Sequence, residues 1–82
     1  STHKAFYRAN GKALAMGADE GLAKFLCDAD GKIIGCHILG EHAADLIHEA
    51  ATLMKSGATL HNLADSIHAH PSLSEILLSA AE

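Results

Sequence analysis

Residues 22–39 have the sequence Leu-Ala-Lys-Phe-Leu-Cys-Asp-Ala-Asp-Gly-Lys-Ile-Ile-Gly-Cys-His-Ile-Leu, in which two β-type runs flank one turn. The first run extends from Leu22 to Asp28 and the second from Ile33 to Leu39. Asp30-Gly31 lies between them, and this dipeptide is a strong hairpin signal because both residues tolerate the backbone of a tight turn. The stretch therefore predicts two antiparallel strands.

The side chains of this hairpin separate by polarity when Asp28 is paired with Ile33, since alternate residues of a strand point to opposite faces. One face is then wholly apolar, with Ala23, Phe25, Cys27, Ile34, Cys36 and Ile38. The opposite face is mixed, with Leu22, Lys24, Leu26, Asp28, Ile33, His37 and Leu39. Such a pattern is typical of an antiparallel meander that is covered on one side. In this register Cys27 faces Ile34, and a Cys27–Cys36 disulfide would require a different pairing.

The segments next to the hairpin predict one more strand and a helix. Lys4 to Tyr7 is a short strand candidate. Residues 8–20 carry turn residues around the stretch from Lys12 to Met16, and this stretch forms either one helical turn or irregular structure. Glu41 to Ser56 has apolar residues at 43, 46, 47, 50, 53 and 54, which is the period of a helix. Gly57 provides a C-terminal stop for this helix.

Two shorter helices are expected in the last third of the chain. Thr59 can cap the first, with Leu60, Leu63, Ala64 and Ile67 on its apolar side. Pro71 disfavours a helical His70, and Ser72-Leu-Ser-Glu75 has the pattern of a capping box that opens a helix from Leu73 to about Ala81. Strands followed by helices predict an α+β fold, a single domain over residues 1–82 with three helices packed on one face of an antiparallel sheet.

Composition narrows the classes of function. The 82 residues suffice for one small domain and contain no βαβ unit with a dinucleotide fingerprint. Hydrophobic residues make up 49 % and the net charge is −4, so we expect neither nucleic acid nor membrane partners. No apolar run approaches the roughly 20 residues that span a bilayer. The two cysteines do not form a disulfide scaffold, which favours a reducing, intracellular setting.

His70-Pro71-Ser72-Leu-Ser-Glu75 is the most informative stretch for chemistry. Pro71 holds His70 at a non-helical corner, and Glu75, about one turn further on, can reach the imidazole. A carboxylate on one ring nitrogen selects the tautomer and stabilises the imidazolium, as a general base requires. The alternative is structural, because Ser72 and Glu75 can form the capping box while His70 is merely exposed.

Seven histidines raise the question of a metal site. His61, His68 and His70 are the closest group, but the i, i+4 spacing of helical metal ligands does not occur among the histidines, nor does a Cys-x-x-Cys motif. We therefore expect no metal site and treat the histidines as surface residues by default.

The run His68-Ala-His-Pro-Ser-Leu-Ser-Glu75 resembles the C-terminal signature of dihydrolipoamide dehydrogenases, flavin-dependent disulfide oxidoreductases of the 2-oxo acid dehydrogenase complexes. Three more stretches are similar to the same family: Ala9 to Ala13, Ile33 to Gly40 and Ala43 to Ala50. The resemblance extends from about Phe6 to Ala81 and covers only the dimerisation domain. Ser72 stands where the family usually has threonine, which keeps the hydroxyl. The His-Pro…Glu element is shared with relatives such as glutathione reductase.

The resemblance implies a split active site. His70 would reach across a two-fold interface and act as acid–base for the dithiol of dihydrolipoamide in the partner subunit, and Glu75 would hold its imidazole. FAD and NAD would be bound by domains of the parent enzyme outside this chain, which itself would bind no cofactor and have no dehydrogenase activity. Expected partners are a second copy, the rest of the flavoenzyme and the 2-oxo acid dehydrogenase complex, in the cytoplasm or the mitochondrial matrix. The alternatives are a non-catalytic association module and another disulfide reductase of the family.

Overall fold

The computed structural model describes all 82 residues and contains three strands, four α-helices and one short 3₁₀ helix. The strands form an antiparallel sheet in the order β1-β2-β3, with the bounds Thr2–Phe6 (β1), Gly21–Cys27 (β2) and Ile33–Gly40 (β3). The helices are Tyr7–Ala9 (η1), Gly11–Met16 (α1), Ala43–Lys55 (α2), Leu60–Ala64 (α3) and Glu75–Ala81 (α4).

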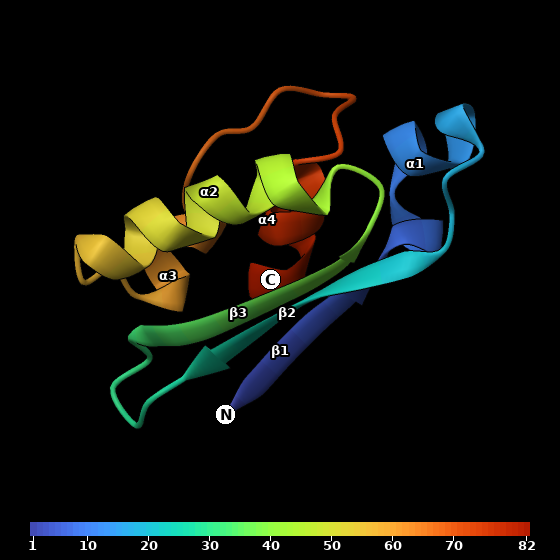
Figure 1. Ribbon diagram of the computed structural model, residues 1–82. Helices are drawn as coiled ribbons and strands as arrows, with labels where there is room; N and C mark the ends of the chain where they lie inside the picture. The colour runs from blue at the N-terminus through green and yellow to red at the C-terminus, as the bar shows by residue number, and fades with distance from the viewer.

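The helices after β3 form a layer beside the sheet, as Figure 1 shows. Helix α2 packs against β3, α4 packs against β1 and β2, and α3 packs mainly on α4. The α+β class is therefore confirmed. Lys12 to Met16, for which the sequence left one helical turn or irregular structure open, belong to a fourth α-helix, α1, at one end of the molecule. None of the helices is long and apolar enough to cross a membrane.

The strand register agrees with the sequence expectation over most of the hairpin and departs from it at one end. Phe25 lies opposite Cys36, and Ala23 opposite Ile38, as expected. A bulge between Leu26 and Cys27 then shifts the pairing so that Cys27 faces Ile33 rather than Ile34. Ile33 is consequently buried at 2 % exposure and Ile34 is 58 % exposed, which reverses their expected faces.

The core lies between the sheet and the helix layer. Its largest fully buried side chains are Tyr7, Phe25, Ile33, Leu63, Ile76 and Leu77. The expected first strand includes Tyr7, but β1 stops at Phe6 and Tyr7 begins η1. The Tyr7 hydroxyl donates to the carbonyl oxygen of Glu41 at 2.7 Å. Gly40 allows this packing: its φ is +142°, and a Cβ there would lie 2.8 Å from the Tyr7 ring. Burial and the nearby Glu41 raise the pKa of Tyr7 above 10.0.

The helices after β3 begin or end at different residues than expected. Helix α2 begins at Ala43 rather than Glu41, because His42 has a φ of +61° and cannot continue a helix. Thr59 caps α3 as expected, and its cap is a capping box completed by Asn62. The helix ends at Ala64, so Ile67 falls outside it and is 99 % exposed. The assignment of Ile67 to an apolar helix face is therefore wrong.

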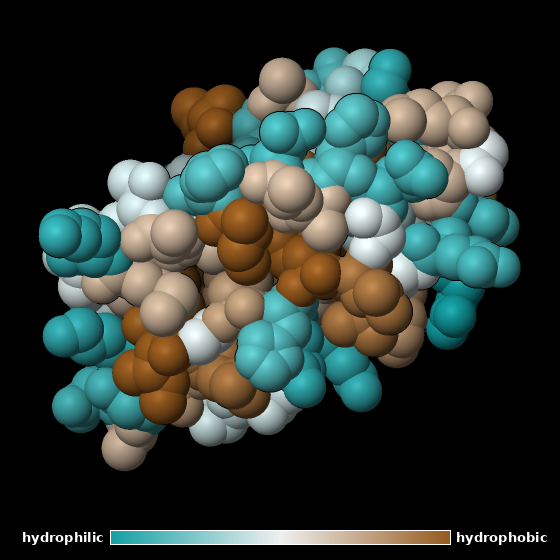
Figure 2. Space-filling view, viewed as in Figure 1, coloured by the Kyte–Doolittle hydropathy of each residue, from teal (hydrophilic) through white to brown (hydrophobic).

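The surface carries apolar side chains among polar ones. In Figure 2, brown hydrophobic groups are exposed over the sheet and at the upper edge of the molecule, beside teal hydrophilic groups. The large hydrophobic residues that remain exposed are Leu14, Met16, Ile34, Leu39, Met54 and Ile67.

Candidate functional site

Residues 65–74 form the loop that joins α3 to α4 and carries His70 (Figure 1). Within it, residues 67–72 make no backbone–backbone hydrogen bond. The peptide bond between His70 and Pro71 is cis. The conformation of this loop is therefore held by hydrogen bonds that involve side chains.

The first of these side-chain contacts joins His70 to Glu75, the two residues that the sequence singled out. The Nδ1 atom of His70 lies 2.9 Å from Oε1 and 3.0 Å from Oε2 of Glu75. Because an ionised carboxylate only accepts hydrogen bonds, Nδ1 carries the proton and donates it. Nε2 has no partner within the chain, and the His70 side chain is 79 % exposed while that of Glu75 is 25 % exposed. The pair thus presents a free imidazole nitrogen to the outside.

Glu75 is fixed and kept ionised by its neighbours. Its Oε1 also accepts the backbone N–H of Ser72 at 3.0 Å. The hydrogen bonds from His70 and Ser72 lower the pKa of Glu75, with smaller contributions from the charges of His70 and His68. A carboxylate held from two sides can orient the imidazole it accepts from.

The expected capping box at Ser72 is only half formed. The Glu75 carboxylate accepts from the backbone of Ser72, but the Ser72 hydroxyl does not accept from the first turn of the helix. It donates instead to the carbonyl oxygen of Ala69 at 2.6 Å and lies 3.1 Å from the hydroxyl of Ser74. The helix accordingly begins at Glu75, not at Leu73, and the Ser72 hydroxyl stabilises the His-Pro corner rather than α4.

Asn10 is a residue of the site that its sequence context does not indicate, because Asn10-Gly11 has the pattern of a turn. Its side chain is buried, its Oδ1 caps α1 by accepting the N–H of Ala13 at 2.9 Å, and its Nδ2 donates to the carbonyl oxygen of Ser72 at 3.1 Å. Asn10 therefore connects the start of α1 to the His-Pro corner, 62 residues further along the chain. No spacing in the sequence indicates this contact.

A second missed contact connects the loop to α2. The Nε2 atom of His68 lies 2.7 Å from Oε2 of Glu49, and the His68 side chain is only 7 % exposed. Of the three histidines in the group considered for a metal, His68 is thus paired with a carboxylate on another element, and His70 with Glu75. No group of three or more His, Cys, Asp or Glu side chains is arranged to hold a metal ion.

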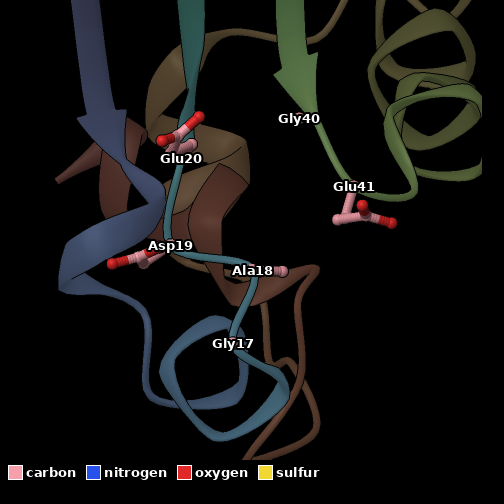
Figure 3. Close-up of a pocket in the computed structure, with 6 residues that line it drawn as sticks. All are labelled: Gly17, Ala18, Asp19, Glu20, Gly40 and Glu41. Atoms are coloured by element: carbon pink, nitrogen blue, oxygen red, sulfur yellow. The ribbon is translucent and has the colours of Figure 1, made fainter.

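Two neighbouring hollows lie near the start of α2, one lined by Met16 and His42 and the other by Gly17 and Glu41. A groove of about 510 Å³ adjoins the corner from Pro71 to Ser74 and is completed by Lys12, Met16, His42, Asp45 and Leu46. A smaller pocket of about 350 Å³ lies where β2 begins and β3 ends. Figure 3 shows that its three carboxylates, from Asp19, Glu20 and Glu41, point away from one another. The pocket therefore does not combine them into a ligand set.

The cysteines lie on the covered side of the sheet and are both free. Burial raises the pKa of the Cys36 thiol to about 11 and that of Cys27 above 9.0. Since the thiolate is the reactive form in disulfide exchange, neither cysteine is activated for it.

Comparison with known proteins places the chain among disulfide reductases. Residues 1–81 match the dimerisation domain of the pyridine nucleotide-disulphide oxidoreductases. Dihydrolipoyl dehydrogenase 2, chloroplastic, of Arabidopsis thaliana is 47 % identical over 78 residues, which are 94 % of this chain and 14 % of that protein. Dihydrolipoyl dehydrogenase of Geobacillus stearothermophilus is 43 % identical over 77 residues, 93 % of this chain and 16 % of that protein.

The fold of a solved structure supports the same family assignment. The crystal structure of LpdA from Mycobacterium tuberculosis superposes with a TM-score of 0.92 at 28 % identity, over 99 % of this chain and 18 % of that one. The chain therefore spans less than one fifth of the length of these relatives. With a family match over nearly all its residues and this fold, the chain belongs to the dimerisation-domain family of the pyridine nucleotide-disulphide oxidoreductases.

Proposed function

We propose that this chain is the dimerisation domain of a dihydrolipoyl dehydrogenase and that it supplies His70 as acid–base to the dithiol site of a partner subunit. The observation that carries this proposal is the His70–Glu75 pair, in which a carboxylate fixes Nδ1 while Nε2 stays exposed and unpaired. No group within the chain forms a hydrogen bond with this nitrogen, so the group that it acts on belongs to another molecule or subunit. Because the relatives described above are dihydrolipoyl dehydrogenases, a dihydrolipoyl dithiol is the first candidate.

The chemistry follows from the two ring nitrogens. Nε2 of His70 takes the proton of a substrate thiol, and the resulting thiolate attacks a disulfide sulfur in the partner's site. One S–S bond forms as the other breaks, and the released thiolate receives the proton back from Nε2. Glu75, ionised and held by Ser72, stabilises the imidazolium between these two steps.

The flavin and the nicotinamide of such an enzyme would be bound outside these residues. The three strands are antiparallel, and the chain contains no βαβ unit of the kind that binds dinucleotides. Bound elsewhere in the enzyme, FAD and NAD would carry the electrons away from the dithiol. The contribution of this chain is restricted to association and to proton transfer at His70.

Association with a second copy is supported by the surface of the chain. Ile67 is 99 % exposed and lies three residues before His70, a position that a partner subunit would cover. A homodimer that buries this loop would bring His70 next to the partner's site. The components of a 2-oxo acid dehydrogenase complex are further proposed partners, which the resemblance of residues 68–75 to the dihydrolipoamide dehydrogenase signature implies.

The test uses a chimeric enzyme, the Geobacillus stearothermophilus dihydrolipoyl dehydrogenase in which this chain replaces the matching segment. We expect His70→Gln to lower turnover of dihydrolipoamide by about 10²–10⁴-fold, which is the usual contribution of acid–base catalysis. Flavin content and dimer content should be unchanged. His42→Gln is the matched control, because His42 is also an exposed histidine bonded to a carboxylate.

Turnover that is unchanged by His70→Gln would rule out the catalytic role and leave the association module. That alternative has its own support, since the bond from Ser72 to Glu75 stabilises the chain without any catalysis. Sedimentation of the 82-residue chain tests association separately, and a strict monomer at high concentration would weaken both functions.

A further inference from the structure

We propose that Glu49 and His68 form a positioning pair that anchors the His70 loop to helix α2, and that catalysis depends on this anchor. The inference rests on the proposed function of His70. Glu49 lies on α2, 19 residues before His68, and the two side chains meet at 2.7 Å. His68 is two residues before His70, so fixing its side chain fixes the backbone that enters the His-Pro corner.

The burial of the pair indicates an anchor rather than a surface contact. The His68 side chain is 7 % exposed and that of Glu49 is 33 % exposed, whereas exposed ion pairs rarely hold a fixed geometry. The Glu49 carboxylate accepts the Nε2–H of His68, which determines how this ring is oriented. A part-buried bond between a loop and a 13-residue helix restricts where the loop can move.

The backbone of the loop makes this anchor necessary. Residues 67–72 form no backbone–backbone hydrogen bond, so nothing in regular secondary structure holds them. Two long-range side-chain bonds flank His70 instead: His68 to Glu49 before it, and Ser72 to Asn10 after it. Without the bond between His68 and Glu49, the loop residues before His70 have no hydrogen bond to another element. The His70–Glu75 contact must then form on a backbone that is less restricted.

The same helix supplies a matched control. Asp45, one turn before Glu49 on α2, accepts from Nδ1 of His42 at 3.3 Å, and both side chains are exposed. This pair joins neighbouring residues and anchors no loop. Removing Asp45 takes away the same charge and the same type of contact from α2, without releasing the segment that carries His70.

The kinetic test compares four variants of the chimeric enzyme as purified dimers with full flavin content. We expect Glu49→Ala and His68→Ala each to lower kcat for dihydrolipoamide by about tenfold or more, with a smaller change in KM, because displacing a catalytic group by as little as 1 Å costs up to about 10²-fold. Glu49→Gln keeps an oxygen that accepts the Nε2–H and should retain most of the activity. Asp45→Ala should behave as the unsubstituted enzyme.

A second measurement reads the His70 ring directly in the 82-residue chain. Nitrogen-15 chemical shifts should show that Nδ1 of His70 carries the proton in the unsubstituted chain and in Asp45→Ala. In Glu49→Ala and His68→Ala, these shifts should move toward the tautomer mixture of a free imidazole. If the pair of Glu49 and His68 only stabilises the fold, its loss would lower Tm and leave the His70 ring shifts of the folded chain unchanged.

Three results would overturn the inference. They are unchanged kcat and ring shifts in Glu49→Ala, equal losses in Glu49→Ala and Asp45→Ala, or no recovery of activity in Glu49→Gln. Failure of the proposed function gives a different pattern, because His70→Gln would then be as active as the unsubstituted enzyme. If His70→Gln is inactive and Glu49→Ala fully active, only the positioning role is wrong.

Discussion

Two exposed histidines in this molecule bond a carboxylate through Nδ1, and they differ in what holds the carboxylate. Between His42 and Asp45 the distance is 3.3 Å, and the side chains are 51 % and 82 % exposed. Between His70 and Glu75 it is 2.9 Å, and Glu75 is 25 % exposed and also accepts the N–H of Ser72. The contact alone is therefore common. The anchoring of the carboxylate and the loop distinguishes the candidate site.

The largest effect is expected at Asn10, whose side chain makes two hydrogen bonds at the His-Pro corner and the start of α1. Asn10→Ala deletes the cap of α1 and leaves the carbonyl of Ser72 without its donor. Each loss costs about 1 kcal/mol, so the free energy of unfolding should fall by about 2 kcal/mol. Chemical denaturation of the 82-residue chain measures this change. The His70–Glu75 pair should then resemble the less constrained His42–Asp45 pair.

Asn10→Asp separates the two roles of Asn10, because a carboxylate still caps α1 but cannot donate to Ser72. Because the new carboxylate oxygen faces the carbonyl of Ser72 at a buried position, we expect the loss of stability to be at least as large as in Asn10→Ala, with the His70 ring shifts still displaced. If both variants are as stable as the unsubstituted chain, Asn10 does not anchor the corner.

The next effect comes from the charge of the two carboxylates. Glu75→Gln should lower dihydrolipoamide turnover of the chimeric enzyme by about tenfold, a part of the 10²–10⁴-fold that acid–base catalysis contributes, since an amide stabilises the imidazolium less than a carboxylate. Asp45→Asn should leave turnover unchanged, because His42 contacts no substrate in the proposed site. Steady-state kinetics checks both. Equal rates for the two variants would remove the distinction between the pairs.

A smaller effect concerns the hydroxyl of Ser72. Ser72→Ala removes the hydrogen bond to the carbonyl of Ala69 and should lower the free energy of unfolding by about 1 kcal/mol. Ser72→Thr keeps the hydroxyl and should be nearly neutral. Thermal unfolding of the two variants, compared side by side, measures the difference. A larger loss in Ser72→Thr than in Ser72→Ala would contradict the role given to the hydroxyl.

The smallest effect is a dependence of stability on pH. The folded chain lowers the pKa of Glu75 below its ordinary value of 4.5, so the contribution of Glu75 is complete above about pH 5. It is lost as the pH falls through the lowered pKa, where the folded carboxylate takes up its proton. Glu75→Gln should therefore flatten the acid side of the stability profile. An identical acid dependence in both proteins would show that Glu75 is not held by its partners.

The sequence predicted the elements better than their ends. Asp30-Gly31 and the alternating side chains indicated the hairpin and most of its register. They could not indicate the bulge after Leu26, which turns Ile33 inward without any change in the apolar pattern. Ile67 continued a helical period, but propensity cannot show that the helix ends at Ala64.

The candidate site was predictable only where its contacts are local. His70 and Glu75 are five residues apart, so their spacing indicated that they could meet. The bonds from Asn10 to Ser72 and from Glu49 to His68 join residues 62 and 19 positions apart, and only the packing of the helices brings them together. Such contacts leave no period or motif in a single sequence.

The absence of backbone–backbone hydrogen bonds in residues 67–72 has a consequence for how this loop would be observed. Amide hydrogens that form no hydrogen bond exchange rapidly with solvent even when the atoms around them are well ordered. Hydrogen exchange would therefore show residues 67–70 as unprotected, as it does a mobile segment, whereas the amide of Ser72 is bonded to Glu75. Measurements of side-chain order would show the opposite, because the order of this loop comes from its own histidine and serine side chains and from the side chains of Asn10 and Glu49, which bond it from other elements.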